Sequence, residues 1–89
     1  MKYTVKWSDR AQKQISKLNK SISEMLVRWV YKNLNDCEEP RQRGKGLTAN
    51  RSGQWRYRVG DYRIIAEIKD DELIILVIEV GHRKSVYDD

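Results

Sequence analysis

The stretch that most limits how this chain can fold is GQWRYRVGDYRII, at residues 53–65. It contains parts of two segments rich in aromatic and β-branched residues, Trp55 to Val59 and Tyr62 to Ile68, with only Gly60-Asp61 between them. A two-residue connection whose first residue is glycine suits the tight turn of a β-hairpin. The composition of the flanking segments is typical of strands. The stretch therefore predicts two antiparallel strands whose register is set by the turn.

The predicted hairpin gathers three arginines on one surface. Directly opposed residues share a sheet face, and the face alternates along each strand. The turn places Arg58 opposite Arg63, and the alternation adds Arg56 and Ile65 to the same face. The other face, which we expect the helices to cover, then consists of Trp55, Tyr57, Val59, Tyr62, Ile64, Ala66 and Ile68.

This arginine face, formed by Arg56, Arg58 and Arg63, has two competing explanations. Opposing two guanidiniums costs up to about 1 kcal/mol in the absence of an anion, and the paired donors of arginine match phosphate and carboxylate. Anion binding is therefore the favoured interpretation. The alternative is that Glu67 or Glu79 neutralises the face within the molecule, and a three-residue turn at 70–72 would place Glu79 opposite Arg63.

The remaining periodic segments complete a mixed pattern of helices and strands. Lys2 to Trp7 alternates apolar and polar residues, as a half-buried strand does. Capping-box patterns at Asp9 and at Ser21 predict the starts of two helices, and Trp29 lies on the apolar stripe of the second, as a core residue would. Leu73 to Val80 is apolar without alternation, which indicates a central strand.

These segments predict one α+β domain over residues 1–89. The order is an N-terminal strand, a two-helix hairpin and an antiparallel three-stranded meander, with both helices packed on one face of a twisted sheet. Residues 36–54 show no period, and Leu47 is their one obvious apolar anchor. A structureless stretch of this length is usually functional or mobile.

Positive charge is concentrated between Arg41 and Arg63. The whole chain carries a net charge of +5, but this segment holds seven basic residues against the single acid Asp61, so the rest of the chain is slightly acidic. Such a concentration of positive charge is typical of a surface that binds nucleic acid or an acidic protein partner. The alternative is an ordinary solvated loop. The candidate RNA-binding or ribosome-binding residues of the segment are Arg41, Arg43, Lys45 and Arg51.

Several classes of protein do not fit. The longest apolar run, Leu73 to Ile78, is six residues long, far below the roughly 20 that a membrane span needs. The start MKYTVKWSDR lacks an apolar signal region, and the lone Cys37 is interpreted as a small buried hydrophobe, so we expect a cytoplasmic protein. Phosphate loops, dinucleotide-binding motifs and Ser-His-Asp sets are absent, and His82 stands alone, so we expect neither a cofactor nor a metal.

The residues of the hairpin and of the tail carry a family resemblance. The stretch QWRYRVGDYRIIAEI, followed by an apolar strand and the ending VGHRKSVY, resembles the RelE-type toxins of the RelE/ParE toxin–antitoxin superfamily. The similarity spans nearly the whole chain, and the HRKSVY ending favours the RelE branch over the ParE branch. The resemblance implies a ribosome-dependent endoribonuclease that cuts mRNA in the A site. It also implies a cognate antitoxin, operator DNA bound only through the toxin–antitoxin complex, and no membrane.

The resemblance also implies catalytic roles for five residues. Arg56 and Arg58 match two basic residues that hold the RNA backbone, and charge stabilisation suits arginine there better than proton transfer. Arg63 matches the arginine that stabilises the scissile phosphate, and Arg83 matches one assigned to the leaving group. Tyr87 matches a tyrosine that stacks on the mRNA base and helps to orient or deprotonate the nucleophile.

The proton acceptor and the function class stay open from the residues alone. Histidine is the residue type suited to proton transfer near neutral pH, but strand alternation directs His82 away from the arginine face, which makes it a secondary candidate. A ParE-like inhibitor of DNA gyrase on the same fold is one alternative function. A non-catalytic module that binds only the antitoxin or nucleic acid is another.

Overall fold

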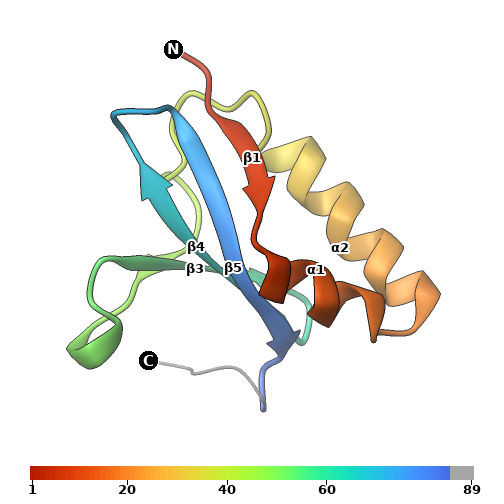
Figure 1. Cartoon of the computed structure of the whole chain (residues 1–89). Coiled ribbons are helices and arrows are strands. Elements are labelled where there is room, and N and C mark those ends of the chain that lie inside the picture. Colours follow the sequence, from red (N-terminus) through yellow and green to blue (C-terminus); the bar gives the residue numbers. More distant parts are fainter. Residues whose placement is uncertain (85–89) are drawn as a thin grey trace.

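The computed structural model describes residues 1–84 and shows a five-stranded mixed sheet with both helices on one face (Figure 1). The strand order is β1-β5-β4-β3-β2, with β1 parallel to β5 and the other neighbours antiparallel. The elements are β1 Thr4–Trp7, α1 Asp9–Ser16, α2 Lys20–Asn33, β2 Lys45–Gly46, the 3-10 helix η1 Ala49–Arg51, β3 Gln54–Val59, β4 Tyr62–Lys69 and β5 Ile74–His82. The predicted α+β class and the order of its main elements are confirmed.

Both helices begin slightly before the predicted residues. The Ser8 hydroxyl accepts a hydrogen bond from the backbone N–H of Ala11 and caps α1, and the Asn19 side chain accepts one from Ser21 and caps α2. Short polar side chains at these positions satisfy N–H groups that a helix start leaves without partners. Within residues 1–84, no helix is long and apolar enough to cross a membrane.

The main core lies between the helices and one face of the sheet. From the sheet it takes the side chains predicted for that face, including the fully buried Tyr57, Ile64 and Ala66. Helix α2 contributes Leu26 and Val30, which are four residues apart and therefore lie on the same side of the helix. A smaller apolar cluster, formed by Leu47, Ile65 and Ile78, occupies the opposite face.

The hairpin has the predicted register. Val59 pairs with Tyr62 and Arg58 pairs with Arg63, and Gly60 adopts the positive φ of 61° that a tight turn beginning with glycine needs. The last strand, β5, is central between β1 and β4, as its unbroken apolar run predicts.

A β-bulge in β5 decides where Glu79 points. Ile65 pairs with Glu79, while the next residue of β4 pairs with Val77, so Ile78 is an extra residue at this step. Val77 and Val80 both belong to the core under the helices, and the two residues between them face the opposite side. A regular alternation would have sent Glu79 and Ile78 to different faces, whereas a bulge can re-aim a side chain.

The stretch 36–54 is more structured than its sequence predicts. It contains β2 and η1, and Leu47 is buried against Ile65 on the second face of the sheet. A two-residue strand has no detectable period, and β2 exists because Lys45 and Gly46 pair with β3. Pairing with a distant strand is a tertiary interaction, and local pattern alone cannot reveal it.

Candidate anion-binding site

The three arginines of the hairpin lie together on the sheet face opposite the helices. Arg58 is directly opposite Arg63, and Arg56 lies in the neighbouring row opposite Ile65. Arg56 and Arg63 are only 3% and 5% exposed, whereas Arg58 is exposed. Two arginines of the face, Arg56 and Arg63, are therefore buried, and the third, Arg58, is exposed to solvent.

Strand β5 lies next to β4 and contributes the neighbouring residues of the arginine face. Gly81, not Glu79, lies opposite Arg63, which corrects the predicted register by two positions. The β-bulge and the turn at residues 70–73 together set this offset. Glu79 lies one row away, opposite Ile65, in the same row as Arg56. A carboxylate therefore does occupy the arginine face, as the alternative explanation proposed.

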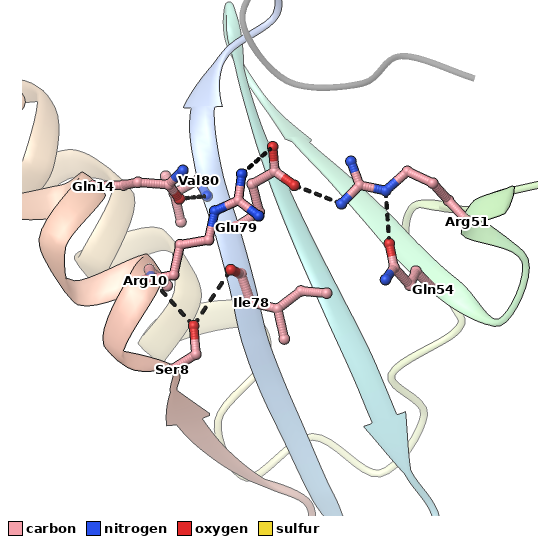
Figure 2. Close-up of polar contacts among 9 residues, drawn as sticks. Ser8, Arg10, Gln14, Arg51, Gln54, Ile78, Glu79 and Val80 are labelled. Carbon is pink, nitrogen blue, oxygen red and sulfur yellow. Dashed lines mark hydrogen bonds and ion pairs between the residues drawn. The ribbon is translucent and has the colours of Figure 1, made fainter.

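The Glu79 carboxylate is held between two arginines that approach it from either side of β5 (Figure 2). Arg51, which ends η1, lies 2.5 Å from Glu79 Oε1, and Arg10 from α1 lies 3.6 Å from Oε2. The Arg51 Nε group also donates to Gln54 Oε1 at 2.8 Å. Glu79 is 5% exposed, and a buried carboxylate needs such compensation because desolvation of its charge is costly.

Beyond the end of β1, side chains of α1 and of its N-cap residue bond to the backbone of β5 (Figure 2). The Ser8 hydroxyl donates to the carbonyl of Ile78 at 3.3 Å, and Gln14 Oε1 accepts from the backbone N–H of Val80 at 2.6 Å. These contacts satisfy backbone groups of β5 beyond the reach of the four-residue β1. They also fix the stretch of β5 that carries Glu79.

The basic loop, residues 41–53 before β3, is attached to the rest of the molecule at its start. Arg41 forms two hydrogen bonds of 3.0 Å to the Asp70 carboxylate, which also accepts one of 2.7 Å from the Tyr3 hydroxyl. The Arg41 and Tyr3 donors lower the pKa of Asp70 to about 2, and the same bond raises the pKa of Tyr3. Arg41 thus has a carboxylate partner inside the chain.

The loop is attached a second time along β3. The Tyr57 hydroxyl donates to the carbonyl of Pro40 at 2.6 Å, and the Trp55 indole donates to that of Arg43 at 2.7 Å. Burial raises the pKa of Tyr57, so this hydroxyl stays a donor. Gly44 packs so tightly that a Cβ there would lie 2.3 Å from the carbonyl oxygen of Arg56, and its φ is +81°. Only glycine fits this position without strain.

A cavity of about 570 Å³ opens where this loop meets β3 and α2. Among the described residues it is lined by Trp29, Arg43, Gly44, Lys45, Arg56, Tyr57 and Arg58. The cavity therefore brings two exposed cations of the loop, Arg43 and Lys45, next to two arginines of the arginine face.

The structure describes His82 and Arg83 among the remaining predicted site residues. His82 pairs with Tyr62 in the sheet, and their rings meet edge to face with centroids 5.4 Å apart, away from the arginine face as expected. Arg83 follows the end of β5, with its guanidinium 4.0 Å from the Asp61 carboxylate in the hairpin turn. Tyr87 lies outside the described residues.

The sequence missed two participants in this region. Arg10 is an exposed arginine on a helix, and nothing local distinguishes it from a solvated residue; its contact is with a strand 69 positions later. Trp29 was assigned to the core and does pack against it, but it also lines the cavity. Within residues 1–84, no group of three or more potential metal-ligating side chains is close enough to hold an ion.

Comparison with known proteins identifies the family. Residues 5–87 match the family described as "ParE toxin of type II toxin-antitoxin system, parDE". Toxin RelG of Mycobacterium tuberculosis is 30% identical over 87 residues, which cover 98% of each chain. A putative RelE-like toxin protein of Escherichia coli is 27% identical over 84 residues, 94% of this chain and 86% of the relative.

Solved structures agree with this assignment. A chain of the toxin–antitoxin complex RelBE2 from Mycobacterium tuberculosis superposes with a TM-score of 0.84 at 29% identity, covering 93% of this chain and 100% of that one. A mutant of the Escherichia coli toxin RelE in the free state has a TM-score of 0.74 at 24% identity, covering 96% and 87%, and shows the shared fold. The chain therefore belongs to the ParE toxin family and is a type II toxin of the RelE/ParE superfamily.

Proposed function

We propose that this toxin is a ribosome-dependent endoribonuclease that cleaves mRNA in the A site. The observation that carries the proposal is the pair Arg58 and Arg63, directly opposed on the arginine face with Arg56 in the next row. Three guanidiniums on one rigid sheet face match the phosphates of an extended RNA strand.

The reaction asks little of the protein beyond position and charge. RNA carries its own nucleophile, the 2′-hydroxyl, which attacks the adjacent phosphorus while the 5′-oxygen leaves. Holding these atoms in line can supply several kcal/mol of the barrier. Fixed guanidiniums stabilise the negative charge that develops on the phosphoryl oxygens.

The residues divide this work by position. Arg56 and Arg58 hold the RNA backbone, Arg63 stabilises the scissile phosphate and Arg83 stabilises the leaving oxygen. Tyr87 stacks on a base. Because arginine stays protonated and tyrosine titrates near 10, the ribosome's alignment of the substrate contributes more than a strong base on the toxin does.

The basic loop contributes the remaining contacts in this proposal. Arg43 and Lys45 are exposed and bind RNA of the message or of the ribosome. Arg41 and Arg51 pair with Asp70 and Glu79, and we assign them to holding the loop in place beside the arginine face.

The partners follow from the same surface. Two structural neighbours are described as a toxin–antitoxin complex of Mycobacterium tuberculosis and a RelE–RelB complex from Pyrococcus horikoshii, which supports a cognate antitoxin here. An acidic antitoxin segment over the arginine face would inhibit by occupying it. Operator DNA binds through that complex only, and the toxin acts in the cytoplasm on ribosomes.

A ParE-like inhibitor of DNA gyrase is the second candidate. The observation in its favour is the matched family, whose description names the ParE toxin. This function uses the same fold without RNA chemistry, so a guanidinium aimed at a scissile phosphate has no role in it.

One experiment separates these functions. Primer extension on a defined mRNA in a purified translation system, with and without ribosomes, maps any cleavage by the toxin. We expect cuts inside A-site codons only when ribosomes are present. An intact message together with inhibited supercoiling by purified gyrase would establish the second candidate, and inactivity in both assays would indicate a binding module alone.

A further inference from the structure

The cavity beside Trp29 has the size and lining of a small-ligand site. Its volume of about 570 Å³ lies within the range of roughly 300–1,000 Å³ that is usual for such sites. Its walls come from three parts of the fold: Trp29 from α2, residues 43–45 from the basic loop and residues 56–58 from β3. We call it the Trp29 cavity.

The cations of this cavity differ from the other basic residues of the same region. Arg41, Arg51 and Arg83 each lie within ion-pair distance of a carboxylate of the chain. For Arg43, Lys45 and Arg58, by contrast, no carboxylate partner is found within residues 1–84. The chain thus pairs other basic residues with carboxylates and leaves the positive charge of three exposed side chains at the walls of the cavity.

One wall of the cavity is aromatic and held in place. The rings of Trp29 and Tyr57 lie 6.1 Å apart at an interplanar angle of 52°, and the Tyr57 hydroxyl is fixed to Pro40. Tyr57 is fully buried, while Trp29 is only partly buried and offers an indole surface to the cavity. Aromatic side chains of this kind are platforms for nucleic-acid bases.

The loop residues that line the cavity are also held in place. The carbonyl of Arg43 accepts a hydrogen bond from the Trp55 indole, and Gly44 packs directly on the backbone of Arg56. Lys45 is paired with Arg56 in the sheet. The backbone that carries the loop cations is therefore positioned before any ligand arrives, which lowers the entropic cost of binding.

We infer that the Trp29 cavity is a nucleotide subsite, which takes one unpaired RNA nucleotide flanking the cleavage position. Its base lies against Trp29, and its phosphate lies among Arg43, Lys45 and Arg58. This inference rests on the proposed function for the identity of the ligand. Arg58 links the two sites, because it lines the cavity and is directly opposite Arg63 on the arginine face.

A nucleotide fits this lining better than an acidic peptide does. The cavity combines several phosphate donors with one π surface, and a nucleotide presents an anion and an aromatic ring together. An acidic peptide would use the cations and leave the indole surface without a matched group. The test below treats the peptide as the competing outcome.

The test measures binding without ribosomes or cleavage. Dissociation constants of the full chain are measured by titration calorimetry for a four-nucleotide single-stranded RNA and for the same oligomer with its bases removed. The variants are Arg43→Ala, Lys45→Ala, Trp29→Leu and Trp29→Phe. Arg28→Ala, an exposed cation on the same helix that does not line the cavity, is the matched charge control.

The inference predicts a specific pattern. Arg43→Ala and Lys45→Ala each weaken both oligomers and lower the slope of log affinity against log salt by about one. Trp29→Leu weakens the base-containing RNA by roughly fivefold to a hundredfold and leaves the abasic oligomer nearly unchanged. Trp29→Phe retains most of the affinity, and Arg28→Ala behaves as the unmodified chain.

Two results would overturn the inference. One is RNA affinity that is the same in all cavity variants as in Arg28→Ala. The other is unchanged RNA affinity together with weakened binding of the cognate antitoxin, which would make the cavity a peptide site. Because Arg43→Ala and Lys45→Ala alter exposed side chains only, they test the phosphate contacts even if Trp29→Leu fails to fold. The comparison of the two oligomers on the unmodified chain then tests the base contact. A toxin that binds RNA in this pattern but cuts no message would retain the subsite and lose the proposed function.

Discussion

At the scale of single residues, the basic side chains of this toxin divide into two groups. Arg41 and Arg51 meet carboxylates of the chain, whereas Arg43, Lys45 and Arg58 face solvent at the Trp29 cavity. Composition counts all of them as equal positive charges. The contacts show that some cations pair with carboxylates within the fold and that others are exposed at the cavity.

Arg63→Ala tests the proposed catalytic face. If Arg63 stabilises the scissile phosphate, its removal lowers ribosome-dependent cleavage by about 10²-fold or more, because a preorganised charge is lost from the transition state. The measurement is the rate of A-site cleavage by primer extension. Circular dichroism should match the unmodified chain, which shows that the loss of cleavage is not a loss of fold.

Arg63→Lys is the matched control for that substitution. It keeps the charge but loses the two-pronged donor geometry, so we expect an intermediate rate. Full cleavage activity in Arg63→Ala would remove Arg63 from the site. Persistent toxicity without cleavage would favour the gyrase function.

At the scale of elements, the basic loop is attached to the rest of the molecule at two points in its first half. Asp70 joins Arg41 to Tyr3 of the N-terminal segment, and Gly44 brings the loop onto β3. The loop therefore presents Arg43 and Lys45 from a fixed backbone although most of it has no regular secondary structure.

The Asp70 contacts predict a specific pH dependence of stability. Its pKa in the folded protein is about 2 and that of an unfolded aspartate is about 3.9, so the contacts stabilise the protein fully above about pH 4. This stabilisation is lost as the pH falls through about 2. The melting temperature of Asp70→Asn should lie below that of the unmodified chain at neutral pH, and the difference should vanish between pH 4 and pH 2.

Asp71→Asn is the control for this measurement, because it changes an exposed neighbouring acid in the same turn. It should follow the unmodified chain at every pH. A constant difference between Asp70→Asn and the unmodified chain down to pH 2 would contradict the assigned pKa.

Gly44→Ala tests the contact between the loop and β3. Alanine at a left-handed φ costs about 1–2 kcal/mol by itself, and here its Cβ would also overlap the Arg56 carbonyl oxygen at 2.3 Å. Gly53→Ala is the matched control, since its φ is +94° and nothing lies within 4 Å. Urea unfolding should show a larger loss for Gly44→Ala than for Gly53→Ala, and equal losses would mean that the loop moves away without cost.

At the scale of the whole molecule, Glu79 connects three elements that are distant in sequence. It belongs to β5 and meets Arg10 of α1 and Arg51 of η1, which approach from opposite sides (Figure 2). The Glu79 carboxylate thus connects helix α1 to the basic loop beside the arginine face. A single side chain thus stabilises the relative placement of both.

Glu79→Gln should destabilise the whole molecule. The amide keeps the shape but removes the charge that compensates Arg51, a side chain only 19% exposed. We expect a loss of about 2–4 kcal/mol in the free energy of unfolding, measured with urea, because the substitution removes the charge attraction of a largely buried ion pair. Arg10→Ala should cost less than about 1 kcal/mol, since Arg10 is 66% exposed.

Glu67→Gln is the control on the same face of β4, where Glu67 lies opposite Gln54. Its effect should stay within about 0.5 kcal/mol. If Glu79→Gln were as mild as Glu67→Gln, the Glu79 contacts would not hold helix α1 and the basic loop together.

Local pattern was sufficient to predict the two helices, the four longer strands and one face of the sheet. The Gly60-Asp61 turn set the register of β3 and β4, and the two-residue period of a strand then assigned Arg56 and Arg58 to the face opposite Tyr57. These features depend on neighbours in the chain, so a short stretch of sequence contains the information that determines them.

Tertiary structure alone decided what surrounds that face. The β-bulge at Ile78 turned Glu79 toward it, β2 formed only by pairing with β3, and Arg10 reached Glu79 across 69 residues of sequence. Each of these contacts arises when distant segments pack together. The sequence by itself therefore determined the arginine face, and only the packed structure separated the cations that stabilise the fold from those that line a cavity.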